Sequence, residues 1–148
     1  MRAKQYLSQL QKLDVVIEQK LQELDELKKI TVDLKGIDYT KEKVKSSATH
    51  CADFENTIIK IMDLESKINA EIDKFVDKKH TIINQIQALN DTKYVQVLHK
   101  RYVEYKGFEQ IACEMGYTYD YVRKVHSRAL IDFEKKICKI IKKAQKGT

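Results

Sequence analysis

The strongest constraint on the fold is a strict apolar repeat in residues 54–89. Eleven positions follow one another there at alternating steps of four and three, and nine of them are apolar: Phe54, Ile58, Ile61, Glu65, Ile68, Ile72, Phe75, Lys79, Ile82, Ile86 and Leu89. A sustained repeat of 3.5 residues predicts a helix of the left-handed coiled-coil type, here over residues 52–89. A lone helix cannot bury so narrow a stripe. It must pack on another helix of the chain, on a second copy, or on both.

The eleven positions form the seam of the predicted coiled coil, and two of them are charged, Glu65 and Lys79. Polar groups at a seam can fix the register or the oligomeric state at some cost in stability. Alternatively, their long stems cover the seam while the charged ends reach water, and we favour this interpretation.

A second apolar stripe comes earlier in the chain and predicts a helix over residues 3–34. Its members are Leu7, Leu10, Leu13, Ile17, Leu21, Leu24, Leu27, Ile30 and Leu34. Residues 36–50 are polar and predict a connector, with Gly36 suited to the position after the helix. The two stripes cover 28 and 36 residues, so a hairpin within one chain would leave part of the second seam uncovered. This mismatch favours a homodimer through the coiled coil.

The composition agrees with an all-α fold. No proline and only four glycines occur in 148 residues, which is too little turn material for a many-stranded sandwich or barrel. Three widely spaced cysteines without a Cys-x-x-Cys pair argue against a disulfide framework and favour a reducing compartment. We find no apolar leader segment and no run that approaches the roughly 18 residues of a membrane span. We therefore expect a cytoplasmic protein that does not enter a membrane.

The positive charge lies in the last part of the chain. Residues 1–91 carry 15 Lys and Arg against 16 Asp and Glu, a net charge of −1. Residues 92–148 carry 13 against 6, a net charge of +7. This asymmetry indicates binding to nucleic acid or to a membrane surface, or simply a solvated basic face. We expect two domains, a helical arm at 1–90 and a basic domain at 91–148.

Residues 91–148 have the spacing of a helix-turn-helix. Asn90 or Asp91 can cap a helix whose stripe is Val95, Leu98, Tyr102 and Tyr105, and which Gly107 ends. A short helix follows over 108–115, and then a turn at Gly116. Glycine adopts the left-handed backbone of such a turn at a lower free-energy cost than other residues. A long helix then starts near residue 119, with Thr118 as its cap. Small Ala112 permits a close crossing, and Val122, Val125, Ala129 and Phe133 face the core.

Subtracting these core positions leaves the outer face of the second helix as the candidate DNA-binding site. Its residues are Thr118, Tyr119, Asp120, Tyr121, Arg123, Lys124, Ser127 and Arg128. Arg123 suits a bidentate contact with guanine, and the tyrosines suit thymine methyl groups or phosphates. Lys124 and Arg128 suit phosphates, as do the free N–H groups of the helix N-terminus near Thr118. The six lysines from Lys135 to Lys146 fit either a DNA backbone or the dipole of a helix C-terminus.

No pattern typical of catalysis occurs. His50, His80, His99 and His126 have no metal-ligand spacing with the cysteines, and there is no phosphate loop or nucleophile elbow. We read Cys113 as a small buried residue. The sequence predicts no enzyme, no metal and no cofactor.

Residues 94–130 resemble the fourth region of the primary sigma factors. The resemblance rests on Leu-x-x-Arg-Tyr at 98–102, on Ile-Ala-x-x-Met-Gly-Tyr at 111–117 and on Val-x-x-x-His-x-Arg-Ala-Leu at 122–130. The whole chain is similar to small phage and prophage regulators of the ArpU/RinA type, through residues 4–7, 44–47 and 61–65 followed by the sigma-like segment. The resemblance implies activation of late phage genes, with promoter contact through the second helix of the helix-turn-helix.

We therefore expect a sequence-specific transcriptional regulator that binds double-stranded DNA and acts with RNA polymerase. Two alternatives stay open: the DNA-recognition small subunit of a phage packaging terminase, and a non-enzymatic coiled-coil adaptor. A large ring-shaped assembly would favour the terminase subunit, and a lack of DNA affinity at low salt would favour the adaptor.

Overall fold

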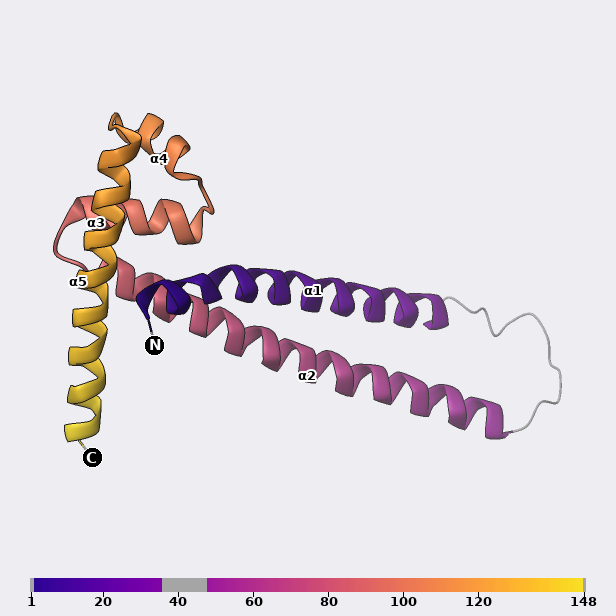
Figure 1. Cartoon of the computed structure of the whole chain (residues 1–148). Helices are drawn as coiled ribbons and strands as arrows, with labels where there is room; N and C mark the ends of the chain where they lie inside the picture. The colour runs from indigo at the N-terminus through magenta and orange to yellow at the C-terminus, as the bar shows by residue number, and fades with distance from the viewer. Residues whose placement is uncertain (1, 36–47, 148) are drawn as a thin grey trace. The chain divides into compact units, whose positions relative to one another are not determined.

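Every element that the structure describes is helical, which confirms the predicted all-α fold. The computed structural model describes residues 2–35 and 48–147. In chain order its elements are α1 (Ala3–Lys35), α2 (Ala48–Gln87), α3 (Thr92–Leu98), η1 (His99–Val103), α4 (Phe108–Met115) and α5 (Tyr119–Lys146), as Figure 1 shows.

The first two elements are the long helices that the apolar stripes predict. The bounds of α1 agree with the predicted range 3–34 within one residue. The second helix, α2, begins at Ala48 rather than at 52 and ends at Gln87 rather than at 89. Residues 48–50, which we predicted as connector, therefore belong to α2. The remainder of the predicted connector, residues 36–47 with Gly36, lies outside the described residues.

Helices α1 and α2 form an antiparallel pair (Figure 1). Three polar pairs link them, namely Tyr6 with Gln85, Asp14 with Lys79, and Lys20 with Glu71. The residue number falls in α2 as it rises in α1, which is the register of a helical hairpin. A helix of the same chain thus covers the seam of α2.

The seam of α2 has the predicted register, since all eleven positions of the repeat are buried or half-buried. At the seam, Lys79 pairs with Asp14 of the neighbouring helix, so its charged end has a protein partner. In α1 the prediction is wrong at two positions, because Leu21 is 50% exposed and Ile30 is 46% exposed. Three consecutive three-residue steps lead from Leu21 to Ile30, and each falls about 60° short of a full turn. These steps rotate Ile30 away from the seam.

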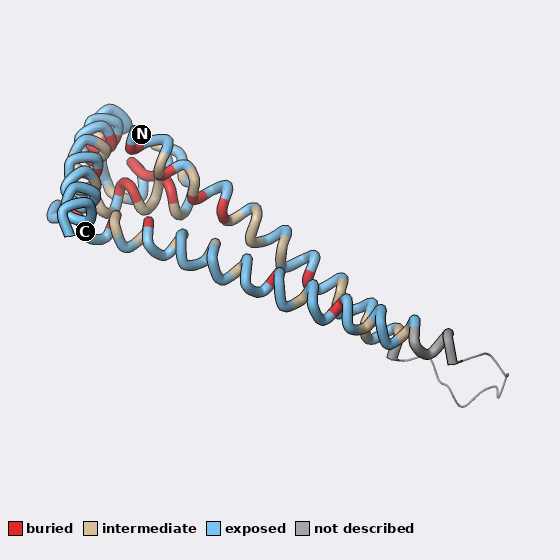
Figure 2. Tube along the Cα trace, turned by 90° about the horizontal axis from the view of Figure 1, so that it is seen from below, coloured by how far each residue is buried: buried red, intermediate tan, exposed pale blue. Residues whose placement is uncertain are grey.

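By packing, the chain divides into two compact units. We call Met1–Asp14 with Asp77–Thr148 the head and Val15–Val76 the arm. Buried residues gather in the head (Figure 2), whereas the buried apolar residues described in the arm are Leu24, Ile61 and Ile68. The head therefore has a hydrophobic core, and the arm has only a thin seam. The head contains the predicted basic domain at 91–148 together with the first turns of α1 and the last turns of α2.

Helix α3 begins where the sequence predicts. The backbone N–H of Lys93 donates to Asp91 Oδ1 at 2.9 Å, so Asp91 caps the helix. Without a break the chain then widens into the π-helical turn η1, which ends at Val103. The expectation that this helix runs on to Gly107 is therefore wrong.

The chain leaves η1 through Tyr105, which has a left-handed backbone with φ of 57°. This conformation costs a non-glycine residue about 1–2 kcal/mol. Contrary to our prediction, Tyr105 thus does not continue the apolar stripe of this helix. Its hydroxyl instead donates to Asp14 on α1, and burial together with that carboxylate raises the pKa of the hydroxyl. The contact holds the end of η1 against α1.

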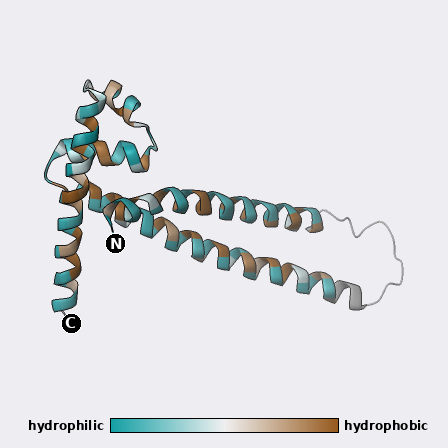
Figure 3. Cartoon of the chain, viewed as in Figure 1, coloured by the Kyte–Doolittle hydropathy of each residue, from teal (hydrophilic) through white to brown (hydrophobic). Residues whose placement is uncertain are grey.

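Helices α4 and α5 pack as predicted for a helix-turn-helix. One buried cluster joins α3, α4 and α5, and it consists of Val97, Ile111, Ala112, Val122 and Val125. Farther along α5, Ala129 and Phe133 are also buried, which confirms the four predicted core positions. The alternating hydropathy along α5 is visible in Figure 3. A single stripe of α5 therefore faces the core, and its remaining faces are mostly polar, with Ile131, Ile140 and Ile141 exposed.

The turn between α4 and α5 depends on Gly116. Its φ is 71°, and the N–H of Tyr117 donates to the carbonyl of Ala112 at 3.0 Å, as in a Schellman motif. A Cβ at Gly116 would meet no heavy atom within 4 Å, so a side chain there has room. Any destabilisation by a side chain would thus arise from the backbone conformation alone.

We expect Gly116→Ala to lower the free energy of unfolding by about 1–2 kcal/mol, because alanine disfavours a positive φ. The free energy of unfolding should fall less in Gly116→Asn, since asparagine tolerates the left-handed backbone region. Urea denaturation followed by circular dichroism measures both. Gly107→Ser is the control, because Gly107 caps α4 with φ of −71°, where serine fits well. Equal losses at Gly116 and Gly107 would contradict the assignment.

Candidate nucleic-acid interface

The outer face of α5 begins at a capped helix N-terminus. The Thr118 hydroxyl accepts a hydrogen bond from the N–H of Tyr121 at 3.3 Å, as the sequence predicts. The cap fixes the first turn of α5 directly after the Gly116 turn. Val122 and Val125 pack α5 on α3 and α4. The head core therefore fixes the orientation of the first turns of α5 and of the side chains that they expose.

Five of the eight predicted site residues lie together on one side of α5. They line a shallow hollow along the helix, and they are Asp120, Arg123, Lys124, Ser127 and Arg128. Their spacing of three and four residues places them on one helical face. All five are exposed. We call this surface the α5 face.

The other three predicted residues have local structural partners. The Thr118 hydroxyl caps the helix, as described above. Tyr119 is exposed, with the edge of its ring on Phe108 and the Arg123 guanidinium 5.8 Å from its centroid. Tyr121 is half-buried, packs on Tyr117 at 4.8 Å between centroids, and lies against the apolar cluster. Tyr119 therefore borders the α5 face, and Tyr121 belongs largely to the packing of the turn.

The hydroxyl of Ser127 is also engaged, because it donates to the carbonyl of Arg123 one turn earlier at 3.1 Å. This bond is local to the helix. The polar groups of the α5 face that remain available for a ligand are thus mainly its cationic side chains.

The charge of the head is unevenly neutralised. Lys100 and Lys106 both pair with Glu114, at 2.7 and 2.9 Å, and Lys106 also pairs with Glu104 at 3.2 Å. The two ammonium groups hold the pKa of Glu114 at about 2, and the carboxylates raise the pKa of Lys106. These two lysines fasten η1 and the following turn to α4. Their charge is largely cancelled within the head.

The cations of α5 differ in this respect. Arg123, Lys124 and Arg128 form no ion pair with any carboxylate in the described part of the chain. The same holds for the six lysines of the C-terminal half of α5, Lys135, Lys136, Lys139, Lys142, Lys143 and Lys146. The net positive charge of the head is therefore concentrated along α5, where it can attract an anionic partner.

Sequence reasoning missed Lys93 as a neighbour of this surface. Its ammonium lies 3.4 Å from the Tyr121 hydroxyl and 5.8 Å from the ring centroid of Tyr117. The Tyr121 hydroxyl is the main cause that raises the pKa of Lys93. Since Lys93 lies 28 positions before Tyr121, no local pattern could have indicated the contact.

Across residues 2–35 and 48–147, no group of three or more His, Cys, Asp or Glu side chains could hold a metal ion. Cys113 is exposed on α4, so the prediction that it is buried is wrong. A search of the described helices found none with the length and apolar character that a membrane crossing requires.

Comparisons of the chain with family models, with curated proteins and with solved structures found no match.

Proposed function

We propose that the chain is a non-enzymatic transcriptional regulator that binds double-stranded DNA through the α5 face. The observation that carries this proposal is the position of Arg123, Lys124 and Arg128. They are exposed on the second helix of a helix-turn-helix, and no carboxylate of the described residues neutralises them. A helix that follows such a turn is the one that enters the major groove in DNA-binding proteins of this type.

In this proposal the first three turns of α5 lie in the major groove, which is about 12 Å wide and admits one helix. Arg123 donates to guanine O6 and N7, while Lys124 and Arg128 contact phosphates on the groove edges. Thr118 satisfies the N–H of Tyr121, so the N–H groups of Tyr119 and Asp120 are left for a phosphate at the helix N-terminus. The lysines beyond Phe133 add affinity without sequence preference.

The arm has a separate role in this proposal. It carries exposed apolar side chains on both helices, namely Val15, Leu21, Ile30, Val32, Ile59, Met62, Leu64 and Val76. Because α1 and α2 already cover one another's seam, these exposed residues are the apolar positions of the arm that remain for contact with a second copy of the chain. A homodimer through the arm would present two α5 faces to two half-sites. The sigma-like sequence of the head supports action with RNA polymerase at phage or prophage late promoters, in the cytoplasm.

The proposal predicts that Arg123→Ala weakens binding to a preferred site by about 1–3 kcal/mol, because one bidentate base contact is lost. The site is first obtained by selecting genomic fragments that the purified protein binds, and affinity is then measured by fluorescence anisotropy. On unrelated DNA the loss should be much smaller. Lys28→Ala removes the same charge from the arm and is the control. An equal loss on all sequences would show that Arg123 contacts only phosphate.

Salt dependence tests whether the chain binds DNA at all. If Lys124, Arg128 and the C-terminal lysines contact phosphates, the affinity should fall steeply as salt rises. A chain without affinity at low salt would instead support the coiled-coil adaptor. Sedimentation of the DNA complex provides a further distinction, because a large ring would favour the terminase subunit over a regulatory dimer.

A further inference from the structure

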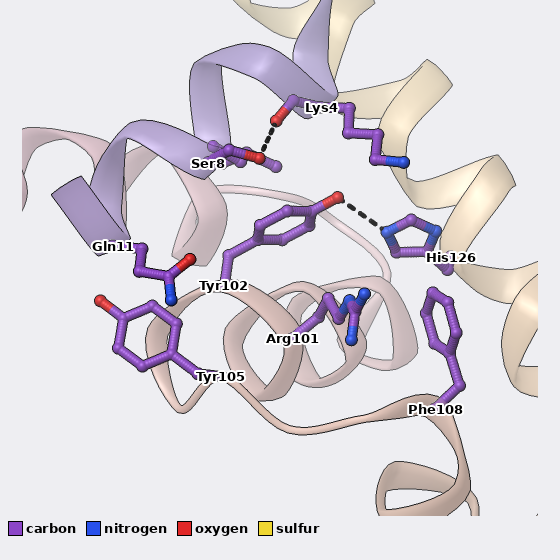
Figure 4. A pocket seen from close by; sticks show the side chains of 9 residues that line it. Lys4, Ser8, Gln11, Arg101, Tyr102, Tyr105, Phe108 and His126 are labelled. Atoms are coloured by element: carbon purple, nitrogen blue, oxygen red, sulfur yellow. Dashed lines mark hydrogen bonds between the residues drawn. The ribbon is translucent and has the colours of Figure 1, made fainter.

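A cavity of about 240 Å³ lies in the head between the start of α1, η1, α4 and α5 (Figure 4). Buried side chains form its floor, namely Leu7, Tyr102 and His126. Around them lie Lys4, Ser8, Gln11, Arg101, Tyr105 and Phe108. A concave site with an apolar floor and a few convergent polar groups is the usual form of a small-molecule site. The cavity is separate from the α5 face, with which it shares no lining residue.

The charged residues of the cavity are both cations, Lys4 and Arg101, and none of its lining residues is a carboxylate. Figure 4 shows the two side chains approaching His126 from different sides. Burial, followed by the fields of Arg101 and Lys4, lowers the pKa of His126 to about 4. The imidazole is thus neutral at pH 7, and the positive field of the cavity comes from the two cations.

These two cations also lack the carboxylate partners that three lysines of the head have. Lys79, Lys100 and Lys106 all pair with carboxylates. Neither Lys4 nor Arg101 forms an ion pair among the described residues. The acids of this part of the head are already engaged, since Asp14 pairs with Lys79 and Glu114 with Lys100 and Lys106.

The guanidinium of Arg101 is held in place rather than mobile. It donates to the carbonyl of Lys106 at 3.0 Å and stacks on the Phe108 ring at 4.4 Å from the centroid. Tyr102 and His126 are paired with each other at 2.9 Å between the hydroxyl and Nε2. A preorganised cation beside an aromatic ring suits a ligand that joins a negative group to a compact apolar part.

From this arrangement we infer that the cavity binds a small anion through Lys4 and Arg101, with a carboxylate or phosphate group between the two cations. The apolar part of an organic ligand lies on Phe108 and Leu7. The size of the cavity, below the roughly 300–1,000 Å³ of pockets for drug-sized ligands, limits the ligand to a small molecule. Because Lys4 belongs to α1 and Arg101 to η1, the anion links these two elements of the head.

The test titrates the full chain with sodium benzoate or sodium phosphate, with sodium chloride added to hold the ionic strength constant. The readout is the NMR signal of the His126 imidazole, which lies beside both cations. We expect a saturable shift with at least one of the two anions. In Lys4→Gln the apparent Kd should rise about tenfold, since a charge-assisted hydrogen bond is lost. Lys4 is exposed and only its carbonyl has a structural partner, so the variant should fold normally.

Lys12→Gln is the matched control, because it removes an exposed charge from the same helix outside the cavity. It should leave the Kd unchanged. Three outcomes would overturn the inference: no saturation with either anion, equal weakening in both variants, or a His126 shift with duplex DNA but with neither anion. The last outcome would mean that the cavity takes a backbone phosphate. A failure of DNA binding would not affect the inference, because the titrations with benzoate and phosphate contain no DNA.

Discussion

Replacing Phe133 by alanine is expected to lower the free energy of unfolding by about 3–5 kcal/mol, the range for truncating a buried aromatic side chain. Phe133 is fully buried, and its ring lies 6.1 Å from that of Tyr6 between centroids. Tyr6 in turn donates to Gln85 on α2 at 2.8 Å. The substitution would leave a cavity where α5 meets α1, at the centre of the head.

Urea denaturation followed by circular dichroism measures this loss. Ile131→Ala is the control, since Ile131 lies two residues earlier on α5 and is 55% exposed. Its loss should stay below about 1 kcal/mol, because little apolar area is removed from the core. Similar losses at both positions would mean that α5 does not present this stripe to the head core.

Lowering the pH from 6.5 to 4 is expected to destabilise the head by about 2–3 kcal/mol through His126 alone. Burial holds the pKa of this imidazole at about 4 in the folded chain, against an ordinary value of 6.5. Between these values the unfolded chain binds more protons than the folded chain, so stability falls as the pH falls. This free energy is smaller than the full pKa shift would give, because solvent in the cavity screens part of the electrostatic effect on His126. Above about pH 7.5, where the unfolded imidazole is also neutral, His126 should contribute no pH dependence.

His126→Gln should remove this dependence, because the amide oxygen can still accept from Tyr102 but does not titrate in this range. His80→Gln is the control, since His80 is exposed on α2. Urea midpoints at several pH values between 4 and 7 compare the three chains. Parallel loss of stability in the wild type and in His126→Gln would disprove the assignment. The pKa of Glu114, about 2 in the folded chain against an ordinary value of 4.5, adds a loss of stability that begins at about pH 5 and grows as the pH falls, and this loss is common to all three chains.

The sequence predicted those features that depend on neighbours close in the chain. The register of α2 follows from its repeat, and the turn between α4 and α5 follows from Gly116 and Thr118. Each of these features is decided within one or two helical turns, where periodicity, capping and backbone freedom act. For the same reason, the residues available on the α5 face could be obtained by subtracting its core positions.

The features that the sequence did not predict join distant residues. Tyr105 bonds to Asp14, which lies 91 positions earlier, and this contact stabilises a backbone conformation that local rules disfavour. The cavity brings Lys4 together with His126 in the same way. Such contacts depend on how whole helices pack, and helix periodicity carries no information about them. The apolar stripe of α1 failed at Ile30 because consecutive three-residue steps look regular in the sequence but rotate around the helix.

The contact between Tyr6 and Phe133 also has a consequence for the order of events during protein synthesis. The head includes residues 1–14 and its core includes Phe133, so its first and last parts leave the ribosome at very different times. At about 5–20 residues per second, the start of α1 waits at least several seconds for its partner. During this interval α1 can pair with α2 but cannot complete the head. Until α5 has emerged, Tyr6 therefore lacks the ring of Phe133, and the core of the head stays incomplete.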